Sequence, residues 1–257
     1  MNRMALIQAM SDNIAASKRP RSSDARRVLA KIPGLRSAWH LGRTIQDVWL
    51  DSSEYSQVEL QQEFSRPDPW RYSTDELEKM RHCGELAMLD RVRGKCRFER
   101  VLELGCAEGI FTEFMASRGD SLVAADFNAV ALQRARERCQ QYPHIQFASI
   151  DLRAEPLPGI FDLICAVHVL EYIQNPLALG KIREKIVTAL RPGGYLLLGC
   201  VSFASPVDKS WWSKFLLRGG EHINGFFARH PQLTVVDSAI HPLTRCDSLD
   251  ILLRKTP

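Results

Sequence analysis

The sequence has no Cys-x-x-Cys pair, and its seven cysteines are scattered and odd in number. A small disulfide-stapled scaffold is therefore excluded, and the cysteines are expected to be free thiols, most of them buried, in a reduced cytoplasmic chain. No segment approaches the roughly eighteen uncharged apolar residues that a transmembrane helix needs. Residues 1–30 contain no uninterrupted apolar run, so no secretory signal peptide is predicted.

Metal-binding motifs are also missing. The sequence has no His-Glu-x-x-His motif and no histidine and aspartate cluster with ligand spacing, so no metal is expected. Internal repeats and low-complexity tracts are absent as well. The chain does have 45% hydrophobic and 25% charged residues over 257 positions, which is enough to bury a core without staples.

The charge is distributed unevenly. Residues 1–48 hold nine basic and three acidic residues, a net charge of +6, whereas the whole chain carries +4 and the remainder therefore −2. The remainder has no electrostatic reason to bind nucleic acid. We therefore expect a basic, partly helical extension over residues 1–60, which either contacts an anionic membrane surface or is simply solvated.

Short apolar runs alternate with helical patterns after residue 96. This alternation predicts an α/β domain over residues 61–257, with a doubly wound, mostly parallel, seven-stranded sheet and an antiparallel edge strand. Before it, Pro67 and Pro69 indicate an extended connector, after which Ser73 or Thr74 can cap a helix that ends near Val92. The predicted strands are 100–104, 121–125, 145–150, 161–167, 195–200, 233–238 and 248–253, and the predicted helices are 109–118, 130–140, 177–190 and 221–229.

The first strand leads into a glycine-bearing turn that favours a ligand site. Backbone amides at the start of the next helix point into the crevice, and Gly105 and Gly109 let a ligand approach the chain. The spacing with Ala107 does not match the glycine pattern of dinucleotide sites. Glu103 would repel a phosphate, but it would attract an ammonium or sulfonium group.

Two further acids follow the next two strands. Asp126 can accept two hydrogen bonds from a ribose diol, and Asp151 can accept one from an adenine amine. Each aspartate alone is typical of a helix cap or turn. Together with Glu103 they lie at one edge of a parallel sheet, where open α/β sheets bind ligands.

These residues resemble the class I S-adenosylmethionine-dependent methyltransferases over residues 64–255. The resemblance rests on Asp126, on Ile150-Asp151, and on Leu-Glu-Leu-Gly-Cys-Ala-Glu-Gly at 102–109, Phe-Asp-Leu-Ile at 161–164, Val-Leu-Glu-Tyr-Ile at 169–173 and Leu-Arg-Pro-Gly-Gly-Tyr-Leu at 190–196. Pro69-Trp70, Tyr72 and Gly220-Glu221 look like the NodS-like branch, whose members methylate an amine on a sugar-derived substrate.

The resemblance implies S-adenosylmethionine as co-substrate, a Rossmann-like methyltransferase fold and a role for each matching position. Glu103 would lie near the methionine amine, and Asp126 would hold the ribose. Asp151 and the backbone of Leu152 would hold adenine. The remaining implied cofactor residues are Gly105, Cys106, Ala107, Gly109, Phe127 and His168, with Trp70 and Tyr72 covering the pocket from the N-terminal cap. Ala107 departs from the family, which usually has glycine at that position. His168 and Glu171 also depart from it, because they replace the residues expected in the NodS-like branch.

The implied reaction is an in-line displacement of methyl from sulfur, and it needs a base only if the nucleophile arrives protonated. His168 is the first candidate for that base, because imidazole titrates near neutrality. Tyr172 and Glu171 are second choices. Alternatively, His168 is a structural histidine between sheet and helix, and His222 is a surface residue. Trp211-Trp212 could stack on a sugar or close the core.

Three functions remain in competition. The first is a methyltransferase that acts on nitrogen or oxygen of a small molecule, such as a saccharide, glycolipid or secondary metabolite. The others are a nicotinamide-dependent dehydrogenase and a non-catalytic nucleotide-binding module. The Asn/Asp-Pro-Pro-Tyr signature of nucleobase and glutamine methyltransferases is absent, because the fourth strand ends in Ala166-Val167-His168.

Overall fold

The computed structural model describes residues 61–94, 96–173, 175–202, 219–244 and 246–257, all within one compact unit, Glu54–Pro257. The predicted extension over residues 1–60 and the Trp211-Trp212 pair lie outside the described residues. Among the described residues, no helix is both long enough and apolar enough to cross a membrane.

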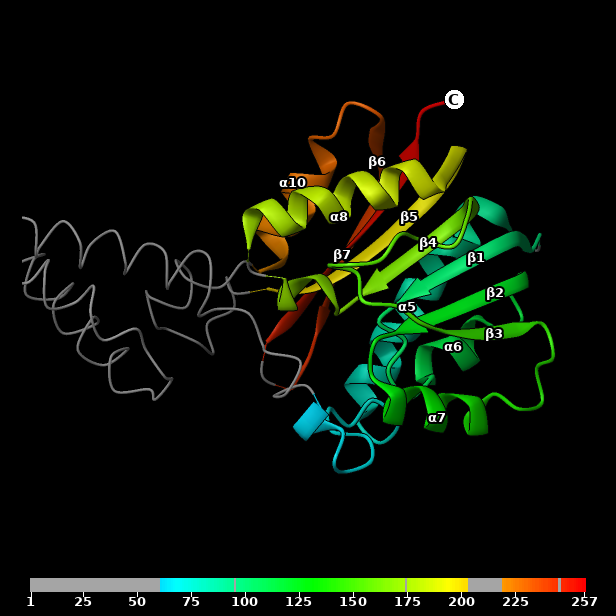
Figure 1. Ribbon diagram of the computed structural model, residues 1–257. Helices are drawn as coiled ribbons and strands as arrows, with labels where there is room; N and C mark the ends of the chain where they lie inside the picture. Colours follow the sequence, from blue (N-terminus) through cyan, green and yellow to red (C-terminus); the bar gives the residue numbers. More distant parts are fainter. Residues whose placement is uncertain (1–60, 95, 174, 203–218, 245) are drawn as a thin grey trace, which may run out of the picture. The chain divides into compact units, whose positions relative to one another are not determined.

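Seven strands form one sheet in the order β3-β2-β1-β4-β5-β7-β6 (Figure 1). The first five pair in parallel, and β7 is antiparallel to both β5 and β6. The predicted, mostly parallel α/β sheet with antiparallel pairing at its edge is thus confirmed, and the edge strand β6 pairs with the antiparallel strand β7. The strands are β1 (Phe98–Leu104), β2 (Gly119–Asp126), β3 (Ile145–Ser149), β4 (Phe161–Val167), β5 (Leu190–Ser202), β6 (Leu233–Pro242) and β7 (Asp247–Lys255).

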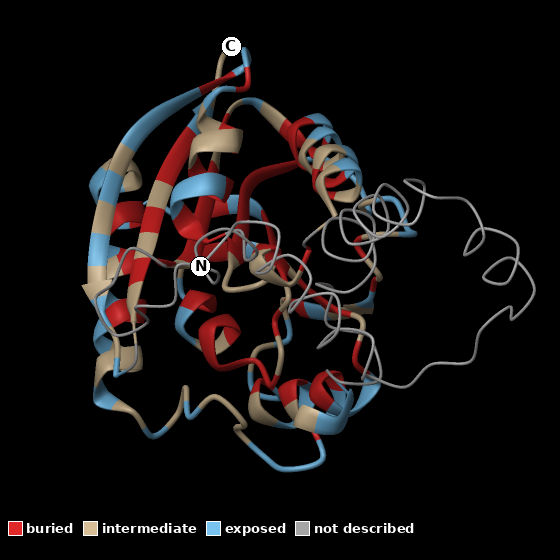
Figure 2. Ribbon diagram, turned by 90° about the vertical axis from the view of Figure 1, so that its left-hand side faces the viewer, coloured by how far each residue is buried: buried red, intermediate tan, exposed pale blue. Residues whose placement is uncertain are grey.

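Helices cover both faces of the sheet and bury two separate apolar cores (Figure 2). One core packs α8 (Pro176–Ala189) and α10 (Gly220–Ala228) on the sheet. The other packs α5 (Glu76–Arg93), α6 (Ile110–Met115) and α7 (Ala129–Arg138) on the opposite face. The central strands are apolar because both of their faces are covered.

The start of β5 differs from the prediction. Pro192-Gly193-Gly194 was expected to separate a helix from a strand that begins at Tyr195, yet α8 ends at Ala189 and β5 begins at Leu190. The register to β4 shifts between Phe161 and Leu163. Gly194 fits this irregularity, because a Cβ there would lie 3.1 Å from the Asp162 carbonyl oxygen.

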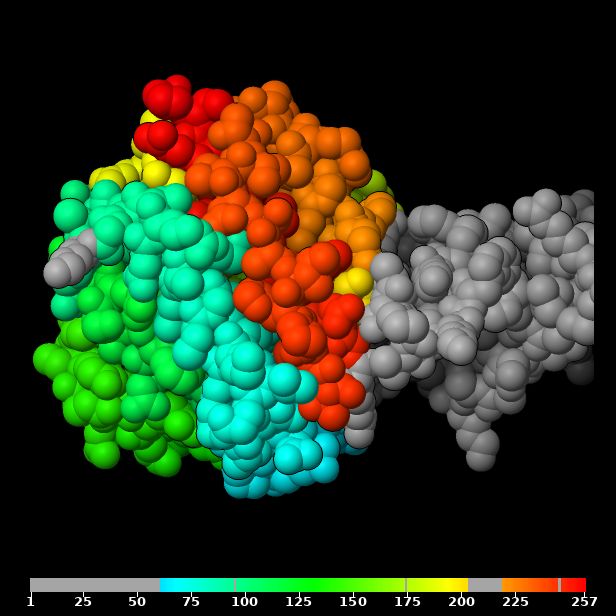
Figure 3. Space-filling model, turned by 180° about the vertical axis from the view of Figure 1, so that it is seen from behind, coloured from blue at the N-terminus to red at the C-terminus, as the bar shows by residue number. Residues whose placement is uncertain are grey.

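The start of α5 also differs, since Asp75 rather than Ser73 or Thr74 caps it. The Asp75 carboxylate accepts from the backbone N–H of Leu77 at 2.9 Å and from the Thr244 hydroxyl at 2.8 Å. Ser73 donates to Asp68 instead. The α5 helix lies along β6, as the teal and orange surfaces in Figure 3 show. This placement brings Glu85 of α5 close to β5, because a Cβ at Gly199 would lie 3.4 Å from Glu85 Oε1.

Candidate functional site

A crevice opens beside the carboxyl ends of β1, β2 and β4, where the strand order reverses. Two adjoining hollows of about 500 Å³ and 800 Å³ make up this crevice. Glu103 lines the smaller hollow, whereas Asp126 and Asp151 line the larger one. The hollows are parts of one crevice, because they share the lining residues Phe64, Trp70, Tyr72, Gly105, Ala107, Val167 and His168.

The loop after β1 has the tight backbone that its glycines predicted. Gly105 has φ +74°, and a Cβ there would lie 2.5 Å from a Val169 methyl group. Gly109 also has positive φ and is the N-cap residue of α6, and its missing side chain lets Ala135 of α7 pack against it. Gly109 therefore positions the helix, while Gly105, Cys106 and Ala107 line the crevice.

Ala107 has φ +47°, a left-handed conformation that costs a non-glycine residue roughly 1–2 kcal/mol. Glycine would remove that cost but add about 0.4–1 kcal/mol of unfolded-state entropy. We therefore expect Ala107→Gly to raise the free energy of unfolding by about 0.5–1 kcal/mol in urea titrations. Ala116→Gly, at a helical φ of −54°, should lower it. A loss of stability in Ala107→Gly would contradict the strain.

Glu103 is 4% exposed, and its Oε2 has no hydrogen-bonding partner among the described residues. Burial raises the pKa of Glu103 to about 8, although the Thr112 hydroxyl offsets part of the shift. The nearby Asp126 carboxylate raises it further. A buried acid without a partner is costly, and a cationic ligand group would satisfy it.

Asp126 ends β2 and links the loop to the next helix. Its Oδ2 accepts from the Ala107 N–H at 2.9 Å, and its Oδ1 accepts from the Asn128 N–H at 2.9 Å. Burial raises its pKa, and these amides offset part of that shift. Each oxygen keeps a second lone pair, so the carboxylate can still accept from a ligand.

Asp151 follows β3 and lines the larger hollow with Phe127 and Leu152. Its Oδ1 accepts from the backbone N–H of Arg153 at 2.9 Å. The Leu152 carbonyl already accepts from the Lys185 ammonium at 2.9 Å. Any contact of the Leu152 backbone with a ligand is therefore expected through its N–H group.

The segment before α5 covers both hollows with aromatic rings. Trp70 stacks on Tyr72 with ring centroids 5.9 Å apart, and it contacts Tyr172 edge-on at 6.5 Å. Glu108 attaches this segment to the loop after β1, because it accepts from the Asp68 N–H at 2.9 Å and from Arg134 at 2.6 Å. Glu108 and Asp68 were not predicted.

His168 lies directly after β4 with φ +52°, which is uncommon for a non-glycine residue and typical of functional sites. Its side chain is 7% exposed and lines both hollows. Nε2 lies 2.8 Å from the Ser248 hydroxyl, and Nδ1 lies 3.3 Å from Glu171 Oε1. The structure therefore places it both within the crevice and within a polar network. Tyr172 lines the larger hollow, whereas Glu171 lines neither.

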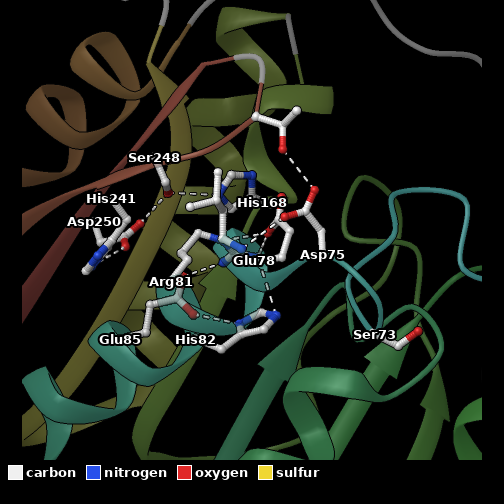
Figure 4. A network of polar contacts seen from close by, with 12 residues as sticks. Ser73, Asp75, Glu78, Arg81, His82, Glu85, His168, His241, Ser248 and Asp250 are labelled. Carbon is white, nitrogen blue, oxygen red and sulfur yellow. Dashed lines mark hydrogen bonds and ion pairs between the residues drawn. The ribbon is translucent and has the colours of Figure 1, made fainter.

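Buried charges on α5 are the main feature that the sequence did not predict. Arg81 and Glu85 are 1% and 0% exposed and form an ion pair at 2.5 Å (Figure 4). Burial would raise the pKa of Glu85, but Arg81 and His82 bring it down to about 2. Burial lowers the pKa of His82. The sequence places Arg81 four residues and His82 three residues before Glu85, but such spacing is equally typical of a solvated helix face.

His222 lies apart from the crevice, and neither a metal site nor a disulfide is found among the described residues. His222 is exposed on α10, as expected of a surface residue. Among the described residues, no group of three or more histidine, cysteine, aspartate or glutamate side chains is arranged to hold a metal ion. All seven cysteines are free thiols, four of them buried.

Comparisons with known proteins agree with this geometry. The family model "Nodulation protein S (NodS)" matches residues 51–237. The nodulation protein S of Rhizobium tropici is 31% identical over 173 residues, which are 64% of this chain and 71% of that protein. The one from Sinorhizobium fredii is 31% identical over 140 residues, which are 54% of this chain and 63% of that protein, so the chain spans less than two thirds of that relative.

An O-methyltransferase and a solved structure extend the comparison. A ubiquinone biosynthesis O-methyltransferase from Xanthomonas campestris pv. campestris is 29% identical over 68% of this chain and 76% of that protein. The crystal structure of N-methyltransferase NodS from Bradyrhizobium japonicum WM9, in complex with S-adenosyl-L-homocysteine, is 26% identical with a TM-score of 0.69, covering 78% of this chain and 98% of that one. The chain therefore belongs to the NodS family of S-adenosylmethionine-dependent methyltransferases.

Proposed function

We propose that this protein transfers a methyl group from S-adenosylmethionine to a nitrogen or oxygen atom of a small molecule. The observation that carries the proposal is the unpartnered, buried Oε2 of Glu103 at the end of the crevice. An α-ammonium group is the cation that fits it. S-adenosylmethionine supplies an electrophilic methyl group on a sulfonium, and the protein supplies alignment and a dry site.

The crevice residues divide between the parts of this donor. Glu103 takes the ammonium group, and Asp126 takes the ribose hydroxyls with its remaining lone pairs. Asp151 and the Leu152 N–H take adenine. Gly105 and Ala107 allow close approach of the methionine portion, and Trp70 and Tyr72 exclude water from above.

His168 acts as the general base when the acceptor arrives with a proton to lose. Its imidazole lines both hollows, so it borders the region where donor and acceptor meet. Tyr172 and Glu171 remain second candidates. Tyr72 is a poor base, because burial raises the pKa of its phenol far above neutrality, although Arg81 opposes the shift.

The acceptor is proposed to be a saccharide-derived amine, with a phenol as the second candidate. NodS relatives named as N-methyltransferases support the amine, and the O-methyltransferase relative supports the phenol. The stacked Trp70 and Tyr72 rings offer the flat apolar surface on which sugars pack.

Two measurements test this function directly. Calorimetry should show saturable binding of S-adenosylhomocysteine and no binding of NADH, because the loop after β1 lacks the glycine spacing of dinucleotide sites. Labelled methyl should then transfer from the donor to glucosamine or, failing that, to catechol. Folded protein that gives no heat with S-adenosylhomocysteine would rule out the methyltransferase.

Asp126→Ala should weaken S-adenosylhomocysteine binding by about 1.5–3 kcal/mol, the range for hydrogen bonds to a charged group. Calorimetry would register this as roughly a 10-fold to 150-fold rise in Kd. Asp120→Ala is the matched control, because Asp120 is exposed near the other end of β2. Equal affinity in the two variants would remove Asp126 from the donor site.

The cellular setting is also proposed. Seven free thiols are compatible with a reducing compartment such as the cytoplasm. Residues 1–60 are proposed to be a basic extension of the catalytic domain at 61–257, able to contact anionic lipid surfaces.

A further inference from the structure

A row of hydrogen-bonding side chains runs from His168 through the sheet, away from the crevice. His168 Nε2 lies 2.8 Å from Ser248 Oγ, and Ser248 Oγ lies 2.7 Å from Asp250 Oδ1. The other oxygen of Asp250 lies 3.2 Å from His241 Nε2. Figure 4 shows these four side chains in line, from His168 to His241.

The row crosses β5 at a position without a side chain. Ser248 and Asp250 lie on β7, and His168 follows β4, with β5 between the two strands. Gly199 of β5 pairs with Asp250, and a Cβ there would lie 2.7 Å from Asp250 Oδ1. Ser248 and Asp250 are both 0% exposed, so bulk solvent does not reach them.

The direction of each hydrogen bond follows from the single proton of a serine hydroxyl. Ser248 donates to Asp250 when that carboxylate is ionised. It can then only accept from His168, which requires the proton of a neutral imidazole to sit on Nε2. The lone pair of the ring is therefore on Nδ1, 3.3 Å from Glu171 Oε1. An ionised Glu171 would favour a proton on Nδ1, so the Ser248–Asp250 pair has to outweigh it.

We propose that Asp250, acting through the Ser248 hydroxyl, is a positioning residue that selects the tautomer of His168 and leaves Nδ1 free to take the acceptor's proton. The inference rests on the proposed function for its catalytic meaning, but the tautomer itself is a property of the folded chain. The arrangement resembles in logic an aspartate that orients a histidine base, with a serine inserted between them.

In the transfer step, two bonds break and two bonds form. The acceptor's N–H or O–H bond breaks, and its proton binds to the Nδ1 lone pair. The acceptor's freed electron pair forms the new bond to the methyl carbon. The carbon–sulfur bond breaks, and its electron pair stays on sulfur. Glu171 lies beside the resulting imidazolium, whose extra proton passes to water when the product leaves.

The charge on Asp250 depends on every group packed against it. Burial raises the pKa of Asp250 well above its ordinary value, Glu85 on α5 raises it further, and Glu171 acts in the same sense. Arg81 opposes them. Burial lowers the pKa of His241, the partner on β6. A protonated Asp250 would reverse the chain and move the His168 proton to Nδ1, so the base is competent only above the pKa of Asp250.

Nitrogen-15 NMR of the histidine rings tests this tautomer without any acceptor. The protein saturated with S-adenosylhomocysteine is titrated from pH 6 to 9, and the His168 signals are identified by their loss in His168→Asn. We expect the Nε2–H tautomer to dominate at the alkaline end. Ser248→Ala should lower the tautomer ratio about tenfold or more, the fold-change expected for one charge-assisted hydrogen bond. Ser248→Thr, which keeps the hydroxyl, should restore it.

Asp250→Asn provides a second variant in case Ser248→Ala does not fold, and it should abolish the pH dependence of the ratio. Asp237→Asn, a neutralised acid on β6 that pairs with Arg91, is the control. An unchanged Nε2–H tautomer in Ser248→Ala, or an Nδ1–H tautomer in the unmodified protein at all pH values, would overturn the proposal. Calorimetry on the same samples reports donor binding separately. A failure of the methyltransferase proposal is thereby distinguished from a failure of this one.

Discussion

Replacing His168 with asparagine is expected to lower kcat by about 10²–10⁴-fold, the usual contribution of a general base. Asparagine tolerates the left-handed backbone at φ +52°, so the substitution adds little strain. The variant therefore removes the titratable ring while it retains the local structure, and its S-adenosylhomocysteine affinity should change less than twofold.

The measurement is single-turnover methyl transfer from labelled donor to the acceptor that the unmodified protein accepts. His222→Asn on the exposed face of α10 is the control for a histidine change as such. Equal kcat values in the two variants would show that His168 is the structural histidine of the alternative interpretation.

Glu103→Gln is expected to have opposite effects on stability and on donor binding. The pKa of Glu103 is raised by burial from 4.5 to about 8, so the folded state holds its proton more tightly than the unfolded chain. Stability therefore falls as the pH rises from about 4.5 towards 8. Glutamine has no proton to lose, and the variant should be more stable at pH 8, on the order of 2–4 kcal/mol.

Donor affinity should move the other way, because glutamine can accept a hydrogen bond from the ammonium group but carries no negative charge to pair with it. We expect a Kd for S-adenosylhomocysteine about 10-fold to 100-fold higher. Calorimetry at pH 7 in buffers of different ionisation enthalpy should also show nearly one proton released by the unmodified protein and none by the variant. Glu99→Gln, on the same strand but exposed, should leave all three quantities unchanged. A less stable Glu103→Gln protein at pH 8 would show that the acid is already satisfied without a ligand.

The sequence predicted the sheet well because its signals are local. β4 is a short apolar run that is buried along nearly its whole length, and Gly105, Asp126 and Asp151 lie at the crevice ends of β1, β2 and β3. β4 has the bounds that were predicted, and the loop after β1 has the positive φ angles that Gly105 and Gly109 suggested. Where two signals compete, the element bounds differ from the prediction. The helix ends before Pro192, as expected, but the following strand also includes Pro192, because its register to the neighbouring strand shifts there.

The polar network could not be predicted, because it depends on pairings far apart in the chain. His168 meets Ser248 across 80 positions, through a gap that only the Gly199 position leaves open. The alternation of Ser248 and Asp250 reads as an ordinary polar face of an edge strand. Arg81 and Glu85 on α5 would usually be interpreted as exposed residues, but both are buried. No periodicity in the sequence distinguishes a buried ion pair from an exposed one.

The position of Cys106 raises the question of how the enzyme avoids methylating its own thiol. It lines the smaller hollow at 3% exposure, close to where an alkylating sulfonium would lie. A thiolate is a far stronger nucleophile than any amine or alcohol acceptor, so an ionised cysteine there would invite self-inactivation. Burial raises the pKa of the Cys106 thiol well above its ordinary range, and the Asp126 and Glu103 carboxylates add to the effect. The two acids that are proposed to hold the donor therefore also keep the Cys106 thiol protonated.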